Sequence, residues 1–211
     1  MFARRAHPDA TQSTSRLEAF TDGVFAIAAT LLVLNLTAHT LGPVTSDGDL
    51  LRALGGMWEL FLNFALSFVL LCLLWMTHMQ QFEHVARVDA VIVWLNNARL
   101  LFIVLVPFAT GLMTEYQEFL VGRLAMPVTF FFAVLCSWLQ WIWAARHRET
   151  MLPDLSAEQV DALGRAGLSA TLISIAVVAL STVIGSAAFA LFFFDFLLTR
   201  VLTPRAARAA S

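Results

Sequence analysis

The sequence has little charge, and lysine does not occur in it. Charged residues make up 13% of the 211 residues, about half the share found in soluble domains, while hydrophobic residues make up 59%. The mean hydropathy of +0.77 means more apolar surface than a core of this size can hide, so the remainder must face lipid. The composition excludes an ordinary soluble domain and indicates an integral membrane protein.

The same scarcities exclude other classes of protein. All 13 basic residues are arginines spread along a chain of net charge −2, so no basic stripe exists to bind nucleic acid. The only cysteines, Cys72 and Cys136, lie inside long apolar runs, which argues against a disulfide framework. His78 and His84 are six residues apart and do not share a helix face, so we expect no metal site and no cofactor.

Five apolar segments follow one another along the chain. They comprise residues 20–36, 54–77, 90–113, 119–144 and 166–198. Each of the first four has about the length that one helix needs to cross roughly 30 Å of hydrocarbon. The fifth is too long for one span, and we expect two helices broken near Gly185 and Ser186, the alternative being one strongly tilted helix. The prediction is an all-α membrane protein with six transmembrane helices.

The arginine distribution predicts the orientation of these spans. With six spans, ten arginines fall on the side of the N-terminus, which places both termini in the cytoplasm. We expect a flexible N-terminal tail over residues 1–19, one transmembrane domain over residues 20–202 and a C-terminal tail over residues 203–211. Acidic residues interrupt the stretch that leads from the N-terminal arginines into the first apolar segment, which argues against a signal peptide. An all-arginine basic set is typical of GC-rich bacteria, so the expected location is a bacterial plasma membrane.

Two local patterns refine this picture. Ser156 and Gln159 form a capping box that predicts a short interfacial helix before the fifth segment. In the first segment Ile27, Leu31 and Leu34 recur at i, i+4 and i+7 and define one helix face. Taken alone, such a stripe favours ordinary packing against neighbouring helices.

Several polar residues lie at membrane depth, where lipid offers no hydrogen-bond partner. The third segment contains Asn96, Asn97 and Arg99. Residues at compatible depth that can serve as partners are Thr21, Asp22 and His78. Trp75 and His78 also lie near the membrane boundary, where interfacial anchoring is the alternative explanation.

A longer pattern resembles a known family. The residues RLEAFTDGVFAIAATLLVL, from Arg16 onward, resemble the R-x-x-x-F-S-D signature of the transmembrane protein 175 family, which comprises potassium-permeable channels of prokaryotes, endosomes and lysosomes. The signature positions here are Arg16, Phe20, Thr21 and Asp22, with Thr21 where serine is usual. Later motifs also match prokaryotic members, namely W-x-x-H at 75–78, Asp89, W-L-N at 94–96 and P-F-x-T at 107–110. Met79 and Ala26 depart from residues found in some members.

The resemblance implies a homotetramer around a pore lined by the four first helices. It implies passive conduction of potassium ions and of other monovalent cations, with Ile27, Leu31 and Leu34 as the pore constriction and Thr30 as a selectivity position. It also implies a polar network that holds the helices in place, formed by Arg16, Asp22, Trp75, His78, Asp89 and Asn96. No TVGYG-like loop is present to coordinate potassium through backbone carbonyls.

Other functions remain open at this stage. Asp22, His78 and Asp89 could serve a proton-coupled secondary transporter, although no inverted repeat is visible. Proton permeation through a channel and a purely structural membrane protein are further alternatives. We do not expect an enzyme, because the sequence has no Ser/His/Asp set, no H-E-x-x-H motif and no paired carboxylates.

Overall fold

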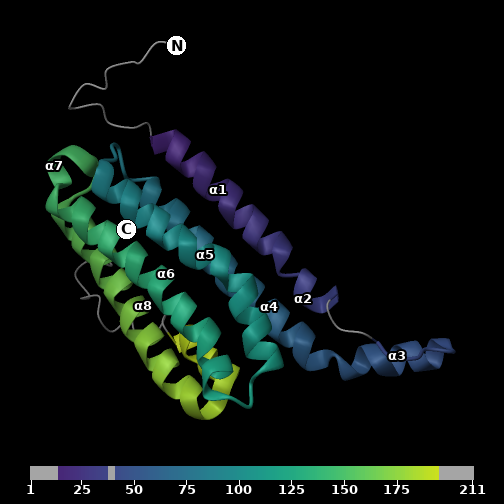
Figure 1. Cartoon of the computed structure of the whole chain (residues 1–211). Coiled ribbons are helices and arrows are strands. Elements are labelled where there is room, and N and C mark those ends of the chain that lie inside the picture. The colour runs from purple at the N-terminus through teal and green to yellow at the C-terminus, as the bar shows by residue number, and fades with distance from the viewer. Residues whose placement is uncertain (1–13, 38–40, 195–211) are drawn as a thin grey trace, which may run out of the picture.

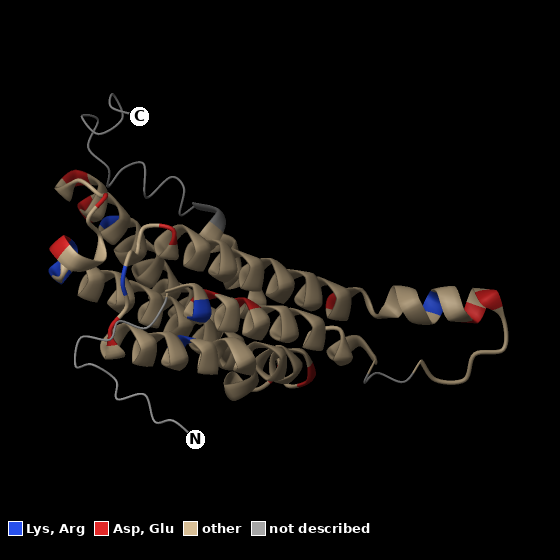
Figure 2. Cartoon of the chain, turned by 90° about the horizontal axis from the view of Figure 1, so that it is seen from above, with Lys and Arg blue, Asp and Glu red and all other residues tan. Residues whose placement is uncertain are grey.

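The computed structural model describes residues 14–37 and 41–194, and long helices dominate this part of the chain (Figure 1). The long helices are α1 (Thr14–Leu31), α4 (Trp58–Phe82), α5 (Ala90–Glu115), α6 (Leu120–Arg146) and α8 (Ala157–Ile184). Shorter elements are α2 (Leu34–Thr37), α3 (Asp47–Gly56), α7 (Arg148–Met151) and the 3₁₀ helix η1 (Gly185–Phe194). The long helices pack side by side, and α3 projects from one end of the bundle (Figures 1 and 2).

Five segments of the described residues are long and apolar enough to cross a membrane. They are Thr14–Thr37, Trp58–Phe82, Ala90–Glu115, Leu120–Arg146 and Ala157–Phe192. Each overlaps one of the five apolar segments predicted from the sequence. Charged residues gather toward the ends of the bundle and on α3 (Figure 2). Arg99 of α5 is an exception, because it is buried within its helix. A helix satisfies its own backbone polar groups, so these apolar helices can lie in lipid.

The fifth apolar segment breaks where the sequence predicted. Gly185 has a φ of +60°, a conformation that side chains other than glycine rarely adopt, and it ends α8. The chain then continues as η1, whose Ala188 and Phe189 are buried, with the Phe189 ring edge-on to Phe130 of α6. Five candidate spans are thus described. The rest of the proposed sixth helix and the C-terminal tail lie outside the described residues.

Three local expectations differ from the structure. The Ser156–Gln159 capping box is present, but it begins α8 itself, which continues without interruption to Ile184, so there is no separate interfacial helix between residues 157 and 184. The reason is that Gly164 and Gly167, which could have ended a short helix, instead pack against Trp141 and Trp138 of α6. The N-terminal boundary also differs, since α1 begins at Thr14, inside the tail expected for residues 1–19.

The third difference concerns the first apolar segment, which is not one helix. The helix stops after Leu31 and resumes at Leu34, with i to i+3 hydrogen bonds from the amides of Asn35 and Leu36 across the turn. Leu32 is fully buried at the break. The side-chain nitrogen Nδ2 of Asn35 donates a hydrogen bond to the Pro107 carbonyl of α5 at 3.0 Å. Both α1, before the turn, and α2, after it, contact α5, and these contacts account for the interruption of the helix.

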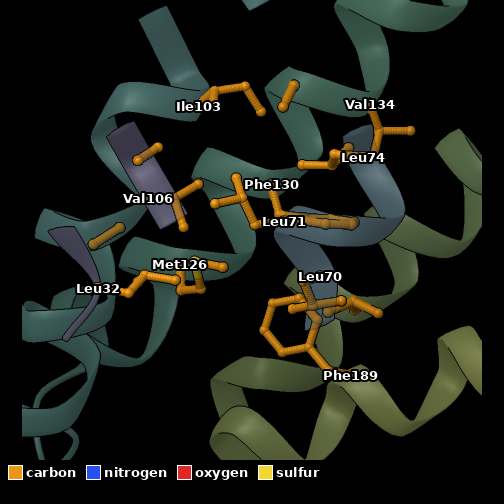
Figure 3. Packing of buried hydrophobic residues seen from close by; sticks show 14 of the residues in the cluster. Leu32, Leu70, Leu71, Leu74, Ile103, Val106, Met126, Phe130, Val134 and Phe189 are labelled. Carbon is orange, nitrogen blue, oxygen red and sulfur yellow. The ribbon is translucent and has the colours of Figure 1, made fainter. Parts of the chain in front are cut away.

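The core fills the space between α4, α5 and α6. Figure 3 shows members of this cluster, among them Leu71 and Leu74 of α4, Ile103 of α5 and Phe130 of α6. A second cluster lies at the α7 end and includes Trp141 of α6. Among the described residues, the first helix α1 packs mainly on α5 and α4, and the side chains on its other side, such as Ile27, are exposed.

The projecting helix α3 starts with a local cap. Ser46 accepts a hydrogen bond from the Asp49 amide, and the Asp49 carboxylate accepts one from the Thr45 hydroxyl at 2.7 Å. The Thr45 hydrogen bond, followed by that of Ser46, lowers the pKa of Asp49 below its ordinary value. No residue of α3 is buried, so contacts within this segment, rather than packing on the bundle, hold its N-terminal end.

Candidate functional site

The first helix has two faces of different character. Its buried face is formed by Leu17, Thr21, Phe25 and Ala28, and it packs on α4 and α5. The opposite face carries the residues that the resemblance assigned to a constriction. Ile27 is 61% exposed, Leu31 is 39% exposed and Leu34, beyond the break, is 55% exposed. A row of large apolar side chains on an uncovered helix face must meet lipid or another protein surface.

The break separates the three expected constriction residues. Ile27 and Leu31 lie on α1, whereas Leu34 begins α2, so the regular i, i+4, i+7 spacing does not extend to Leu34. Thr30 is exposed beside Ile27 and Leu31, and its hydroxyl donates to the Ile27 carbonyl at 2.8 Å. The hydroxyl oxygen therefore keeps lone pairs available on the uncovered face.

Hydrogen bonds tie the buried face of α1 to its neighbours. The Trp75 indole nitrogen of α4 donates to the Asp22 carboxylate at 2.9 Å. Thr21 is fully buried, and its hydroxyl accepts from the Asn96 amide of α5 at 2.8 Å. The side-chain oxygen Oδ1 of Asn96 in turn accepts a hydrogen bond from the side-chain nitrogen Nε2 of Gln140 on α6 at 3.4 Å. The structure thus joins Thr21 with Asn96, and Asp22 with Trp75, as pairs across helices.

Arg99 and His78 form a separate buried pair. Arg99 is fully buried and donates from one terminal nitrogen to the Leu74 carbonyl at 2.6 Å. Its other terminal nitrogen lies 3.4 Å from His78 Nδ1. The guanidinium also lies over the Phe25 ring, 5.9 Å from the ring centroid. His78 therefore contacts Arg99, and no hydrogen bond joins it to Asp22 within the described residues.

Asp89 holds a different position from the other predicted network residues. One carboxylate oxygen accepts from the Ile92 amide and caps α5, and the other accepts from the Trp143 indole of α6, each at 2.9 Å. Asp22, His78 and Asp89 consequently make three separate sets of contacts. This arrangement does not favour the proton-coupled transporter, which needs a connected relay.

The remaining signature residues lie on the surface. Arg16 and Phe20 are exposed, and Arg16 makes no ion pair with any of the described residues. Trp143, Gln140 and Asn35 are partners that the sequence analysis missed. Gln140 could have been found, because it is an isolated amide inside an apolar segment. In residues 14–37 and 41–194 no group of three His, Cys, Asp or Glu side chains is placed to hold a metal ion.

A shallow groove lies beside the Trp75–Asp22 hydrogen bond. It has a volume of about 360 Å³ and runs between α1 and α4. Its lining is mostly apolar and consists of Asp22, Phe25, Ala26, Ala29, Leu71, Cys72 and Trp75. The groove opens next to the uncovered face of α1, so it adds to the surface that a single chain leaves without a protein neighbour.

Known proteins resemble this chain in sequence and in fold. A sequence model of the family described as endosomal/lysosomal potassium channel TMEM175 matches residues 16–107. A protein named a potassium channel from Streptomyces collinus is 40% identical over 104 residues, which cover 49% of this chain and 48% of that protein. A potassium channel from Chamaesiphon minutus is 39% identical over 115 residues, covering 54% and 56%. The alignments thus span about half the length of these relatives.

A solved structure extends the likeness to the whole bundle. The crystal structure of a lysosomal potassium-selective channel TMEM175 homolog from Chamaesiphon minutus matches with a TM-score of 0.70 and 29% identity. The match covers 88% of this chain and 97% of the other. The apolar helices and these relatives make the chain an integral membrane protein, and relatives that are channels confirm the expectation that it is not an enzyme. The matched region, the relatives and the shared fold together show that the chain is similar to channels of the TMEM175 family in sequence and in fold.

Proposed function

We propose that this chain is the subunit of a potassium-permeable cation channel, in which four copies surround a central pore lined by α1. The observation that carries the proposal is the uncovered apolar face of α1 in a chain whose relatives are named potassium channels. Membrane-embedded surfaces of this kind are covered when copies assemble around an axis. We further propose a bacterial plasma membrane with both termini in the cytoplasm.

In this proposal Ile27 and Leu31 form the narrow part of the pore, and Leu34 forms a further apolar ring beyond the helix break. Rings of large apolar side chains can gate a pore by expelling water. A cation that enters must shed hydration water and finds few oxygens to replace it. Potassium holds its water less tightly than sodium, so a potassium preference follows, to which the Thr30 hydroxyls contribute.

The polar pairs hold the pore helix in position in this proposal. The Asp22–Trp75 and Thr21–Asn96 hydrogen bonds fix the buried face of α1 against α4 and α5. A fixed buried face sets the direction of the opposite face, because residues such as Phe25 and Ile27 are about 200° apart around a helix. Asp89 orients α5 and α6 through its cap and its Trp143 contact.

The test is flux through the purified protein in liposomes under potassium or sodium gradients. Wild-type protein is expected to pass potassium faster than sodium. Ile27→Asn is expected to widen or hydrate the constriction, which raises flux and lowers the potassium preference. The matched control is Ile175→Asn, because Ile175 is also an exposed isoleucine, at 49%, but lies on α8, away from α1 (Figure 1). Equal effects of the two substitutions would contradict the assignment of Ile27.

A further inference from the structure

Arg99 is a buried cation that the proposed conduction path does not use. It is the largest fully buried side chain in the described residues and lies in the tenth position of α5, about 14 Å along the helix from Ala90. Ionisable side chains inside membrane proteins are costly and are kept for a function or for a partner. The question is which of the two explains Arg99.

In the part of the chain that the structure describes, the groups that contact the guanidinium are uncharged. Arg99 donates to the Leu74 carbonyl, lies over the Phe25 ring and is 3.4 Å from His78 Nδ1. Arginine has only donors, so His78 Nδ1 must be the acceptor, which makes the ring neutral in this contact. The guanidinium Nε has no hydrogen-bond partner in the described residues. These contacts position the charge without neutralising it.

The acidic groups at the same end of the bundle are occupied elsewhere. Asp22 accepts from Trp75, and Asp89 accepts from Trp143 and the Ile92 amide. No carboxylate of residues 14–37 or 41–194 lies within 4 Å of an Arg99 nitrogen. The remaining titratable group that interacts electrostatically with Arg99 is the buried thiol of Cys136 on α6. Arginine stays protonated in proteins, so within the described residues each subunit holds one positive charge that has no carboxylate partner.

This charge lies directly behind the proposed pore face. Phe25, which contacts the guanidinium, is on the buried face of α1, opposite Ile27. The distance from Arg99 to the pore surface is therefore about the thickness of one helix, roughly 10–12 Å. Protein and lipid fill this region, so the field of the charge is weakly screened by salt.

We propose that the Arg99 charge restrains cation conduction by raising the energy of a cation in the constriction formed around Ile27. In an assembly of four subunits, four such charges surround the pore at the same depth and act together. This inference rests on the proposed channel function and assigns Arg99 as a residue that sets conductance. It acts through its field and contacts no permeating ion.

The test compares single-channel potassium conductance in planar bilayers for four variants of the full chain. Arg99→Met removes the charge at similar length and should raise the conductance about threefold or more, whereas Arg99→Lys keeps the charge and should stay near wild type. Cys136→Asp leaves Arg99 in place but supplies a carboxylate, and it should raise the conductance as well. Cys136→Asn is its uncharged control of similar volume.

Block by barium ions provides a second readout that a structural role would not produce. A divalent cation feels twice the energy of potassium in the same field, so a threefold rise in conductance should accompany a roughly ninefold tighter block. The proposal is overturned if Arg99→Met and Arg99→Lys change conductance alike, or if Cys136→Asp behaves as Cys136→Asn. If Arg99→Met does not assemble, the comparison of Cys136→Asp with Cys136→Asn tests the proposal. Absence of any current from wild type would instead contradict the proposed channel function.

Discussion

At the scale of single residues, several polar side chains inside the bundle are paired across helices. In lipid no water is available to a hydrogen-bonding group, so a buried polar side chain is stabilised by a partner on a neighbouring helix or by a carbonyl of its own helix, as for Thr171 and Ser174 of α8. Thr21 and Asn96 form a pair between α1 and α5, and Ser67 accepts from Thr110 between α4 and α5 at 2.8 Å. Such pairs make the packing of α1 specific, since apolar contacts alone would tolerate several rotations.

The Thr21 hydroxyl offers a clean test of this role. Thr21→Val keeps the side-chain shape but removes the acceptor of the buried Asn96 amide, and it should cost about 1–3 kcal/mol of stability. Thr21→Ser keeps the hydroxyl and should be nearly neutral. The measurement is the thermal unfolding midpoint of purified protein in detergent. Equal midpoints for the valine and serine variants would show that the hydrogen bond does not stabilise the fold.

Trp75 allows the Asp22 contact to be tested in the same assay. Trp75→Phe removes the indole N–H that donates to Asp22, and we expect a loss of about 1 kcal/mol, since both partners are partly exposed. The control is Trp94→Phe, because Trp94 is 74% exposed and makes no hydrogen bond with any described residue. A loss as large for Trp94 as for Trp75 would contradict the assigned role.

At the scale of the elements, the interruptions in the helices are as informative as the helices. The Gly185 turn sends η1 back against α6, and the turn at Leu32 and Val33 divides the first span. The second interruption lies between Leu31 and Leu34, inside the face proposed to line the pore. The Asn35 hydrogen bond to the Pro107 carbonyl fixes this turn to α5. In the proposed channel, movements of α5 would therefore be transmitted to the segment proposed to line the pore.

The start of α6 depends on close backbone packing. A Cβ atom at Gly122 would lie 2.0 Å from the Tyr116 carbonyl oxygen, a backbone atom that cannot move aside easily. Gly122→Ala should therefore lower the yield of folded protein severely. Gly164→Ala in α8 is the matched control, because its Cβ would meet Trp141 at an ordinary 3.6 Å. The yield of monodisperse protein on size-exclusion chromatography is the measurement, and equal yields would contradict the prediction.

At the scale of the whole molecule, one chain leaves its functional surface incomplete. The exposed face of α1 and the groove beside Ala26 and Cys72 lie on the same side of the bundle and lack a protein neighbour. In the proposed tetramer this side faces the axis and the adjoining subunits. The channel would then be a property of the assembly, since the described part of a single chain encloses no continuous pore lined by α1.

The assembly itself is testable by mass. We expect the purified protein, after correction for detergent, to have about four times the 23.3 kDa mass of the chain by light scattering. Ile27→Asn should leave this mass unchanged if Ile27 faces an open pore instead of a helix–helix contact. A monomeric wild-type protein would contradict the proposed arrangement. Dissociation of the variant would indicate that Ile27 lies in a contact between subunits and does not face the pore.

The sequence by itself determined that the protein is an integral membrane protein with five apolar segments, and it located the break at Gly185. It also identified the polar residues at depth, because charge, length and glycine are local properties of the chain. Only the tertiary structure decided which residues are partners, such as Gln140 for Asn96 and Trp143 for Asp89. It also decided that the first span is divided at Leu32 and that α8 is continuous. The physical reason is that lipid is apolar on every side of a membrane helix, so hydrophobic pattern does not tell which face packs on protein, and contacts between distant helices settle it.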